Sequence, residues 1–245
     1  MGEDEFSQKI GRLITSDTYL AYCREIYGYR EYFFNMMDKT QIDYVLDSIP
    51  ISAEDTVADI GCGAGSILNL LAARYSCHGI GIDRLDESCF RCKDKRITYV
   101  KADIDELSDR SMRPTILISV DSLYFSKDLS ALIGRLRSTG CTRMYLFYSQ
   151  YHFNETTADR SLLQSDKTKL AEALRNNSIP FRTTDYSENE RQLYHNSLNV
   201  LQKYKEAFEA EGNVDLYEQR YQDDLLGAEL YRKGFAARYL YIVDG

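Results

Sequence analysis

The sequence predicts an α/β fold with a mainly parallel sheet, and three observations lead to this prediction. From about residue 56, short apolar runs alternate with helix-like stretches, as in parallel strands joined by crossover helices. A glycine-rich turn separates the first apolar run from the first helical stretch. The chain has 245 residues, 44% of them hydrophobic, which suffices for one such core with additional cover segments.

The expected elements follow this alternation in order. Strands are predicted at Thr56–Ile60, Gly79–Ile82, Thr98–Val100, Thr115–Val120, Met144–Ser149, Phe181–Tyr186 and Arg238–Val243. Helices are predicted between them at Ser66–Tyr75, Glu87–Lys93, Lys127–Arg137 and Lys167–Asn176.

Two segments fall outside the alternation. The first fifty residues are helix-like, including Tyr32–Ile49, and Glu188–Gly212 and Val214–Gly234 have the pattern of two long helices. Ligands of such sheets bind outside the carboxyl ends of the strands, so we expect these tyrosine-rich segments to cover a substrate pocket. The predicted divisions are a helical cap (1–50), a core (51–186 and 235–245) and a helical insertion over the substrate site (187–234).

The composition favours a small-molecule partner. The formal net charge of −8 argues against nucleic acid, because phosphate-backbone binding depends on lysine and arginine. The N-terminal MGEDEFSQK lacks the apolar run of a signal peptide or membrane span, and the six cysteines are expected to be reduced thiols. We therefore expect a cytoplasmic protein without a membrane partner, either a monomer or a homodimer.

The turn reads DIGCGAG from Asp59 to Gly65. Its G-x-G-x-G spacing differs from the G-x-G-x-x-G of dinucleotide-binding turns. Asp59 stands two residues before the first glycine, which is unfavourable for a diphosphate but suits a ligand with an ammonium group. Glycines without side chains let such a ligand lie against the backbone.

In these residues the sequence resembles the class I S-adenosylmethionine-dependent methyltransferases, whose D-x-G-x-G-x-G motif matches the turn residue for residue. Asp83 ends the second strand, where that family has the acidic residue that binds both ribose hydroxyls. Asp103 matches the acidic position near the adenine amino group, with the Ile104 backbone beside it. Asp121 follows the fourth strand, at the family's methionine-binding segment.

The resemblance covers residues 55 to 150 and the final strands. It implies a Rossmann-like, seven-stranded sheet whose last strand is antiparallel. The cofactor-binding residues that it implies are Tyr27, Asp59, Gly61, Cys62, Gly63, Gly65, Asp83, Arg84, Asp103, Ile104 and Asp121.

The implied activity is methyl transfer from S-adenosylmethionine to a small-molecule acceptor at nitrogen or oxygen, leaving S-adenosylhomocysteine. The transfer is an in-line displacement that needs alignment rather than a dedicated nucleophile. The segments Tyr19–Gly28 and Met36–Gln41 resemble the N-terminal cap of a bacterial small-molecule branch of the family. There an aromatic residue, here assigned to Tyr27, closes over the cofactor, and the helix carrying Gln41 lines the cleft. The alternative is a helix whose tyrosines only pack.

Two residues are candidates for a catalytic role. Tyr124 lies in DSLYF, where exocyclic-base methyltransferases have N/D-P-P-Y/F; the missing prolines argue against a nucleobase acceptor. His152 follows the fifth strand, and histidine is the residue type most often used as a general base, so it is a candidate for that role or else a surface or structural residue.

Further alternatives stay open. The cover tyrosines form either an aromatic box around the acceptor or a packed core. Cys89 and Cys92 form a C-x-x-C motif without a second pair, so we expect two structural thiols on one helical face and no metal. A protein or peptide methyltransferase would need an open groove, and a non-catalytic S-adenosylmethionine-binding protein would show no turnover.

Overall fold

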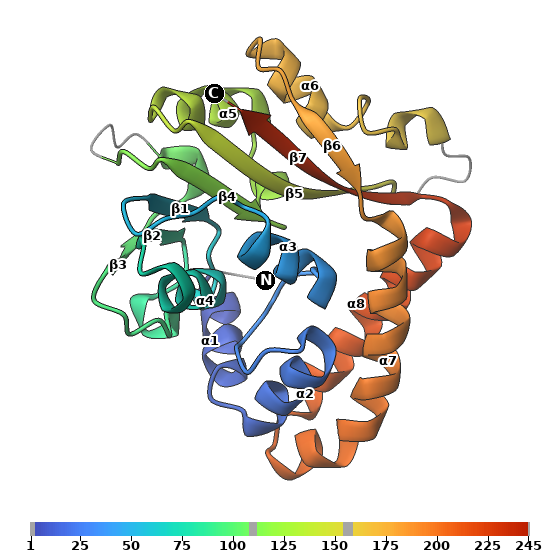
Figure 1. The fold of residues 1–245 in the computed structure, drawn as a ribbon. Helices are drawn as coiled ribbons and strands as arrows, with labels where there is room; N and C mark the ends of the chain where they lie inside the picture. The colour runs from blue at the N-terminus through green and yellow to red at the C-terminus, as the bar shows by residue number, and fades with distance from the viewer. Residues whose placement is uncertain (1–2, 108–111, 154–158, 245) are drawn as a thin grey trace.

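A computed structural model describes residues 3–107, 112–153 and 159–244. Its centre is a seven-stranded sheet of order β3-β2-β1-β4-β5-β7-β6 (Figure 1). The strands are β1 (Thr56–Ile60), β2 (His78–Asp83), β3 (Ile97–Lys101), β4 (Ile116–Val120), β5 (Arg143–Tyr151), β6 (Arg182–Asp185) and β7 (Ala236–Asp244). Strands β1 to β5 are parallel, whereas β7 is antiparallel to both β5 and β6. The predicted fold class is confirmed, including the reversed last strand.

Strand position in the sheet follows from local sequence. The central β4 reads ILISV and is buried throughout, as expected of a parallel strand covered on both faces. The edge strand β6 reads RTTD and is exposed at all four positions, which keeps this edge polar.

Helices cover both faces of the sheet. α3 (Lys39–Asp47) and α4 (Ser66–Tyr75) pack on one face, and α5 (Leu129–Ser138) and α6 (Lys169–Asn176) on the other (Figure 1). Each face therefore has its own apolar core. Short 3₁₀ turns follow several strands: η1 (Glu87–Cys89), η2 (Ile104–Glu106), η3 (Leu123–Phe125) and η4 (Arg160–Leu163).

Four helices form a cover beside the sheet: α1 (Glu3–Leu13), α2 (Asp17–Tyr27), α7 (Ser187–Ala210) and α8 (Val214–Lys233) (Figure 1). Polar contacts join the N-terminal helices to the turn between α7 and α8. Arg12 forms an ion pair with Asp215 (2.7 Å), and Glu211 accepts hydrogen bonds from Ser16 and Thr18. Segments almost two hundred residues apart thus make one cover.

Two predicted helices are wrong in extent. Within Tyr32–Ile49 only α3 is helical, because Asp38 caps its N-terminus by accepting from the Gln41 N–H (2.9 Å). The chain from 28 to 38, between α2 and α3, is irregular. In place of the predicted helix Glu87–Lys93 there is only the turn η1.

The second difference has a packing cause. The ring of Phe90 lies 4.9 Å from that of Tyr99 and fills the space beside Gly65, so tertiary contacts override the helical pattern. Cys89 and Cys92 consequently do not share a helical face, although both are free thiols. Among the described residues, no group of three or more His, Cys, Asp and Glu side chains has the arrangement of a metal site.

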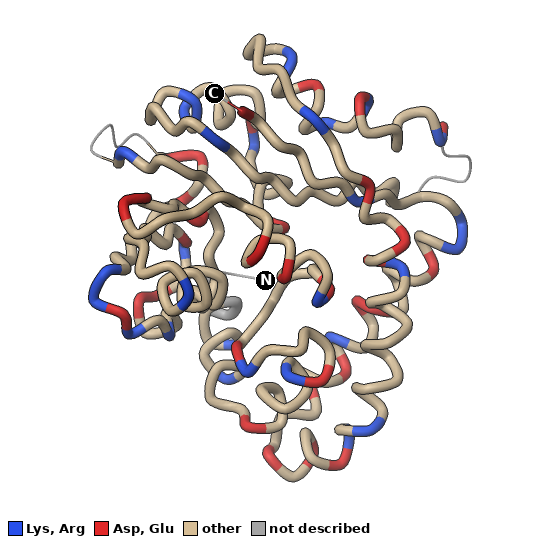
Figure 2. Tube along the Cα trace, in the orientation of Figure 1, with Lys and Arg blue, Asp and Glu red and all other residues tan. Residues whose placement is uncertain are grey.

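Charged residues of both signs alternate over the trace rather than gathering by sign (Figure 2). No helix within the described ranges has the length and apolar character needed to span a bilayer.

Candidate functional site

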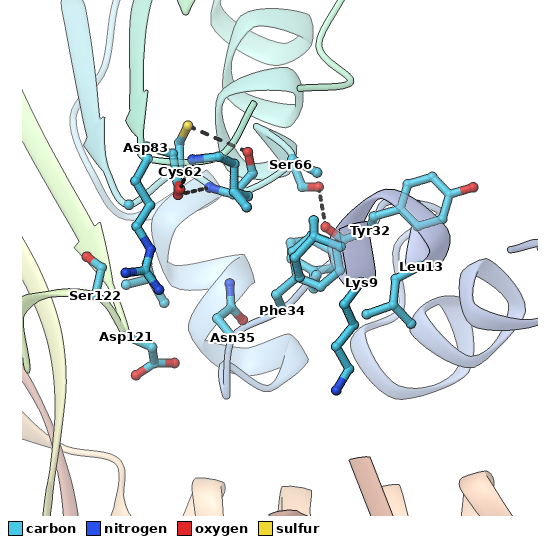
Figure 3. A pocket seen from close by; sticks show the side chains of 18 of the residues that line it. Lys9, Leu13, Tyr32, Phe34, Asn35, Cys62, Ser66, Asp83, Asp121 and Ser122 are labelled. Carbon is cyan, nitrogen blue, oxygen red and sulfur yellow. Dashed lines mark hydrogen bonds between the residues drawn. The ribbon is translucent and has the colours of Figure 1, made fainter. Parts of the chain in front are cut away.

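A cavity of about 330 Å³ lies between the carboxyl ends of β1 to β4 and the cover helices (Figure 3). Most of the predicted site residues line it: Asp59, Gly61, Cys62, Gly63, Asp83, Arg84, Asp103, Ile104, Asp121 and Tyr124. Gly65, Tyr27 and His152 do not. The cover contributes residues that sequence reasoning did not select, among them Lys9, Leu13, Tyr19, Phe34, Phe208, Leu216 and Arg220.

Neighbouring side chains crowd the glycine turn. Gly61 has φ +77°, and a Cβ there would lie 2.2 Å from the Ser122 side chain. Gly65 has φ +81°, and its Cβ would lie 2.2 Å from the ring of Phe90. Both positions therefore need glycine for conformation and for space. Gly63, between them, presents its backbone to the cavity.

Asp83 holds the turn and faces the cavity. Its Oδ2 accepts from the Gly63 N–H (2.8 Å) and its Oδ1 from the Leu85 N–H (3.0 Å). A carboxylate oxygen has two acceptor sites, so each oxygen of Asp83 retains one. Asp103 follows the neighbouring strand β3, where it caps η2 by accepting from the Asp105 N–H (2.8 Å). Two acceptors therefore stand side by side at the strand ends.

Asp59 is buried beneath the turn, with 3% of its surface exposed. Burial, reinforced by the neighbouring Asp83 carboxylate, raises the pKa of Asp59 to about 7. A cation bound beside Asp59 would favour its ionised form.

Asp121 belongs to a buried ion network. Its carboxylate forms two contacts with the guanidinium of Arg238 (2.6 and 3.1 Å) and accepts from the Met36 N–H (2.7 Å). Arg238 is fully buried and also contacts Glu190 (3.3 Å) and Gln41 (2.7 Å). The prediction that the helix carrying Gln41 lines the cleft is wrong, because no residue of α3 lines the cavity and Gln41 lies in this network.

The network extends to the cover helices through Glu190. Burial raises the pKa of this carboxyl, with Arg238 opposing the shift. Glu190 accepts hydrogen bonds from Ser149 on β5, Tyr151 at the end of β5 and Tyr231 on α8. Tyr194 joins through the hydroxyl of Tyr151 (3.0 Å). These tyrosines connect the sheet to the insertion.

The cover tyrosines do not form an aromatic box around the cavity. Tyr194, Tyr204, Tyr217, Tyr221 and Tyr231 are all absent from its lining. Tyr217 stacks on Tyr221 with centroids 5.8 Å apart, and Tyr204 donates to Glu25. The packing alternative describes these residues.

The aromatic residue over the glycine turn is Phe34 rather than Tyr27. Phe34 is labelled in Figure 3. Its ring lies 3.3 Å from the Cβ position of Gly63 and stacks on Tyr19 (5.8 Å between centroids). Tyr27 is fully buried, with its ring against Phe33 (4.9 Å). Both come from the N-terminal segment, but Phe34 lines the cavity from the irregular stretch before α3, whereas Tyr27, at the end of α2, does not line it.

The two catalytic candidates differ in position. Tyr124, on η3, lines the cavity and is 42% exposed. His152 follows β5 and does not line the cavity. Its backbone N–H donates to the carbonyl of Phe235 (2.9 Å). The adjacent Tyr151 hydroxyl is directed to the Glu190 network instead.

Known proteins were found that resemble this chain in sequence over one segment and in structure over nearly the whole chain. A family model described as methionine biosynthesis protein MetW matches residues 39–116. No curated protein sequence matches the chain.

Solved structures align over nearly the whole chain. Phosphoethanolamine N-methyltransferase 2 of Haemonchus contortus, bound to phosphomonomethylethanolamine and S-adenosylhomocysteine, has a TM-score of 0.74 at 15% identity, covering 98% of this chain. This chain spans only 60% of that protein. The cyclopropane synthase MmaA2 of Mycobacterium tuberculosis has a TM-score of 0.73 at 13% identity, covering 98% of both chains. An S-adenosylmethionine-dependent methyltransferase of Geobacter sulfurreducens, bound to S-adenosylhomocysteine, has a TM-score of 0.60 at 14% identity, covering 87% of this chain and 93% of that one.

Proposed function

We propose that this chain, which has the fold of the class I S-adenosylmethionine-dependent methyltransferases, transfers a methyl group from S-adenosylmethionine to a small-molecule acceptor at nitrogen or oxygen. One observation carries the proposal. The ends of four neighbouring strands bring the glycine turn, Asp83, Asp103 and Asp121 to the wall of one cavity. The proposed divisions remain a cap (1–50), a core (51–186 and 235–245) and an insertion (187–234).

The lining fits the parts of S-adenosylmethionine. Asp83 retains an acceptor site on each oxygen, which suits the two ribose hydroxyls. Asp103 and the Ile104 backbone are assigned to the adenine edge. The Gly63 backbone and Asp59 are assigned to the amino-acid part, where an ammonium would stabilise the Asp59 carboxylate. Cys62 and Arg84 complete this wall.

Bound S-adenosylmethionine supplies an activated methyl carbon, and the chain supplies alignment and exclusion of water. Phe34 and Tyr19 offer aromatic faces, which attract a cationic sulfonium. Tyr124 is assigned to the acceptor side because it lines the cavity. A protonated acceptor needs a base, and His152 would have to approach from outside the lining to serve as one.

The cover supports a small acceptor over a peptide. Residues from α1, α2, α7 and α8 join those of the sheet around the cavity, whereas a peptide needs a continuous groove. The volume of about 330 Å³ lies within the range of small-molecule sites. The non-catalytic alternative predicts cofactor binding without turnover on any amine, phenol or carboxylate.

The test is a calorimetric titration with S-adenosylhomocysteine. We expect Asp83→Asn to weaken binding at least tenfold, about 1.4 kcal/mol, because the amide cannot accept from both hydroxyls. Asp86→Asn is the matched control: it lies on the same loop, is 60% exposed and is outside the cavity lining. Its affinity should stay within twofold of the wild type. Absence of binding by the wild type, or equal loss in both variants, would refute the cofactor assignment.

A further inference from the structure

Arg220, on the cover helix α8, lines the cavity, and an ion pair fixes the Nε side of its guanidinium. Its side chain is 17% exposed and its Nε contacts the carboxylate of Asp224 (3.2 and 3.3 Å). Asp224 is 1% exposed and also accepts from Ser197. This ion pair fixes the orientation of the guanidinium.

The other end of the guanidinium has no strong acceptor among the residues that the structure describes. Arginine has five N–H donors. Within the same residues, the one hydrogen-bond partner of Nη2 of Arg220 is the thioether sulfur of Met36 (3.3 Å), which is a weak acceptor. Nη1 makes no hydrogen bond to any residue within the described ranges, and the guanidinium lies 6.0 Å from the ring centroid of Tyr22. A largely desolvated guanidinium with free donors is costly, so an anion there would be stabilising.

Both walls of the cavity carry charged residues, in different proportions. The strand ends contribute carboxylates, whereas Lys9 and Arg220 come from the cover. The side chain of Lys9 extends away from the glycine turn (Figure 3). Asp223 also lines the cover side, but it is exposed to solvent. Arg84, the other basic residue of the lining, lies at the sheet wall with its guanidinium 5.9 Å from the Phe125 ring centroid.

The cover helices also contribute apolar side chains to the cavity. Leu13, Phe208 and Leu216 line it from α1, α7 and α8. A ligand that fits here combines an apolar body with a group that accepts two parallel N–H donors. Carboxylate and phosphate have that geometry, and an ammonium does not.

We propose, on the basis of the proposed function, that the methyl acceptor carries an anionic group, a carboxylate or a phosphate, which Arg220 binds; Lys9 is a second basic residue of the same cavity wall. The acceptor atom, nitrogen or oxygen, then faces the carboxyl ends of the strands. Arg220 thus selects the substrate and takes no part in the displacement.

The test uses the full chain saturated with S-adenosylhomocysteine and three probes that share a phenyl body: phenylacetate, phenyl phosphate and phenethylamine. By calorimetry, the wild type should bind one or both anions at least tenfold tighter than the amine. The better anion distinguishes a carboxylate from a phosphate acceptor. Arg220→Gln combined with Asp224→Asn removes both charges, leaves no uncompensated buried carboxylate and should abolish the preference.

Two further variants complete the design. Arg220→Lys keeps the positive charge but loses the two parallel N–H donors of the guanidinium, so it should retain only part of the preference for anions over the amine. Arg232→Gln, a 71% exposed arginine of the same helix, should retain all of it. Equal binding of anions and amine by the wild type, or a preference that survives the double variant, overturns the inference.

Binding of S-adenosylhomocysteine separates this inference from the proposed function. The double variant should bind it within twofold of the wild type. A tenfold loss would mean that Arg220 holds the carboxylate of the cofactor, which overturns the assignment to the acceptor. If the wild type itself fails to bind S-adenosylhomocysteine, the proposed function fails, and this inference with it.

Discussion

Cofactor affinity should depend on pH through Asp59. This carboxyl lines the cavity, and burial together with Asp83 raises its pKa to about 7. Below that pH the protonated form dominates, and a neutral carboxyl attracts an ammonium weakly. The affinity for S-adenosylhomocysteine should therefore rise as the pH rises through 7.

The magnitude follows from the ionised fraction. With a pKa of about 7, this fraction is about 0.09 at pH 6 and about 0.91 at pH 8. If only the ionised form binds well, affinity rises about tenfold over this interval, or about 1.4 kcal/mol. At pH 7 about half a proton should be released per ligand bound. Calorimetry at three pH values, in buffers of different ionisation enthalpy, measures both quantities.

Asp59→Asn is the control, since it keeps the shape and removes the titration. Its affinity should be independent of pH from 6 to 8 and its binding should release no proton. A wild-type affinity that is flat over this range, or a rise that persists in Asp59→Asn, would contradict the role given to Asp59.

Two further predictions concern stability. Arg238→Met leaves two buried carboxylates without their cation, so urea denaturation should show a loss of about 3–5 kcal/mol, whereas Arg182→Gln, at a 69% exposed ion pair, should change stability by less than about 1 kcal/mol. Losses of equal size would show that the buried network does not stabilise the fold. Gly61→Ala places a Cβ 2.2 Å from the Cβ of Ser122, at φ +77°, and should lower the free energy of unfolding by about 2–4 kcal/mol. Gly140→Ala, at φ +84° with no atom within 4 Å of the new Cβ, should lower it by only about 1–2 kcal/mol. Thermal unfolding of the pair checks this, and equal shifts would mean that crowding behind the turn is unimportant.

Elements set by local pattern could be predicted from the sequence. Strand β1 and helix α4 have the predicted bounds because an apolar run, a glycine turn and an amphipathic stretch follow each other directly. The strand-end acids were also predictable, because parallel strands bring their carboxyl ends to the same edge.

What could not be predicted depends on contacts distant in sequence. The choice of Phe34 over Tyr27 depends on the path of an irregular segment, which has no periodicity to follow. Arg238 pairs with a carboxylate 117 residues away. Its only trace in the sequence is a lone basic residue within the apolar run AARYLYIV, and no spacing rule identifies the partner. Arg220 looks like any charged residue of an exposed helix until α8 is placed over the cavity.

The position of β7 has a consequence for the order of biosynthesis. Ribosomes release a chain from its N-terminus, so all other strands and both insertion helices emerge before Ala236–Asp244. Yet β7 lies between β5 and β6, and it carries the guanidinium that neutralises Asp121 and Glu190. Until it inserts, β6 has no neighbour within the described sheet and the two carboxylates have no common cation. Asp121, in the cavity wall, is therefore not neutralised by Arg238 until this last strand has left the ribosome.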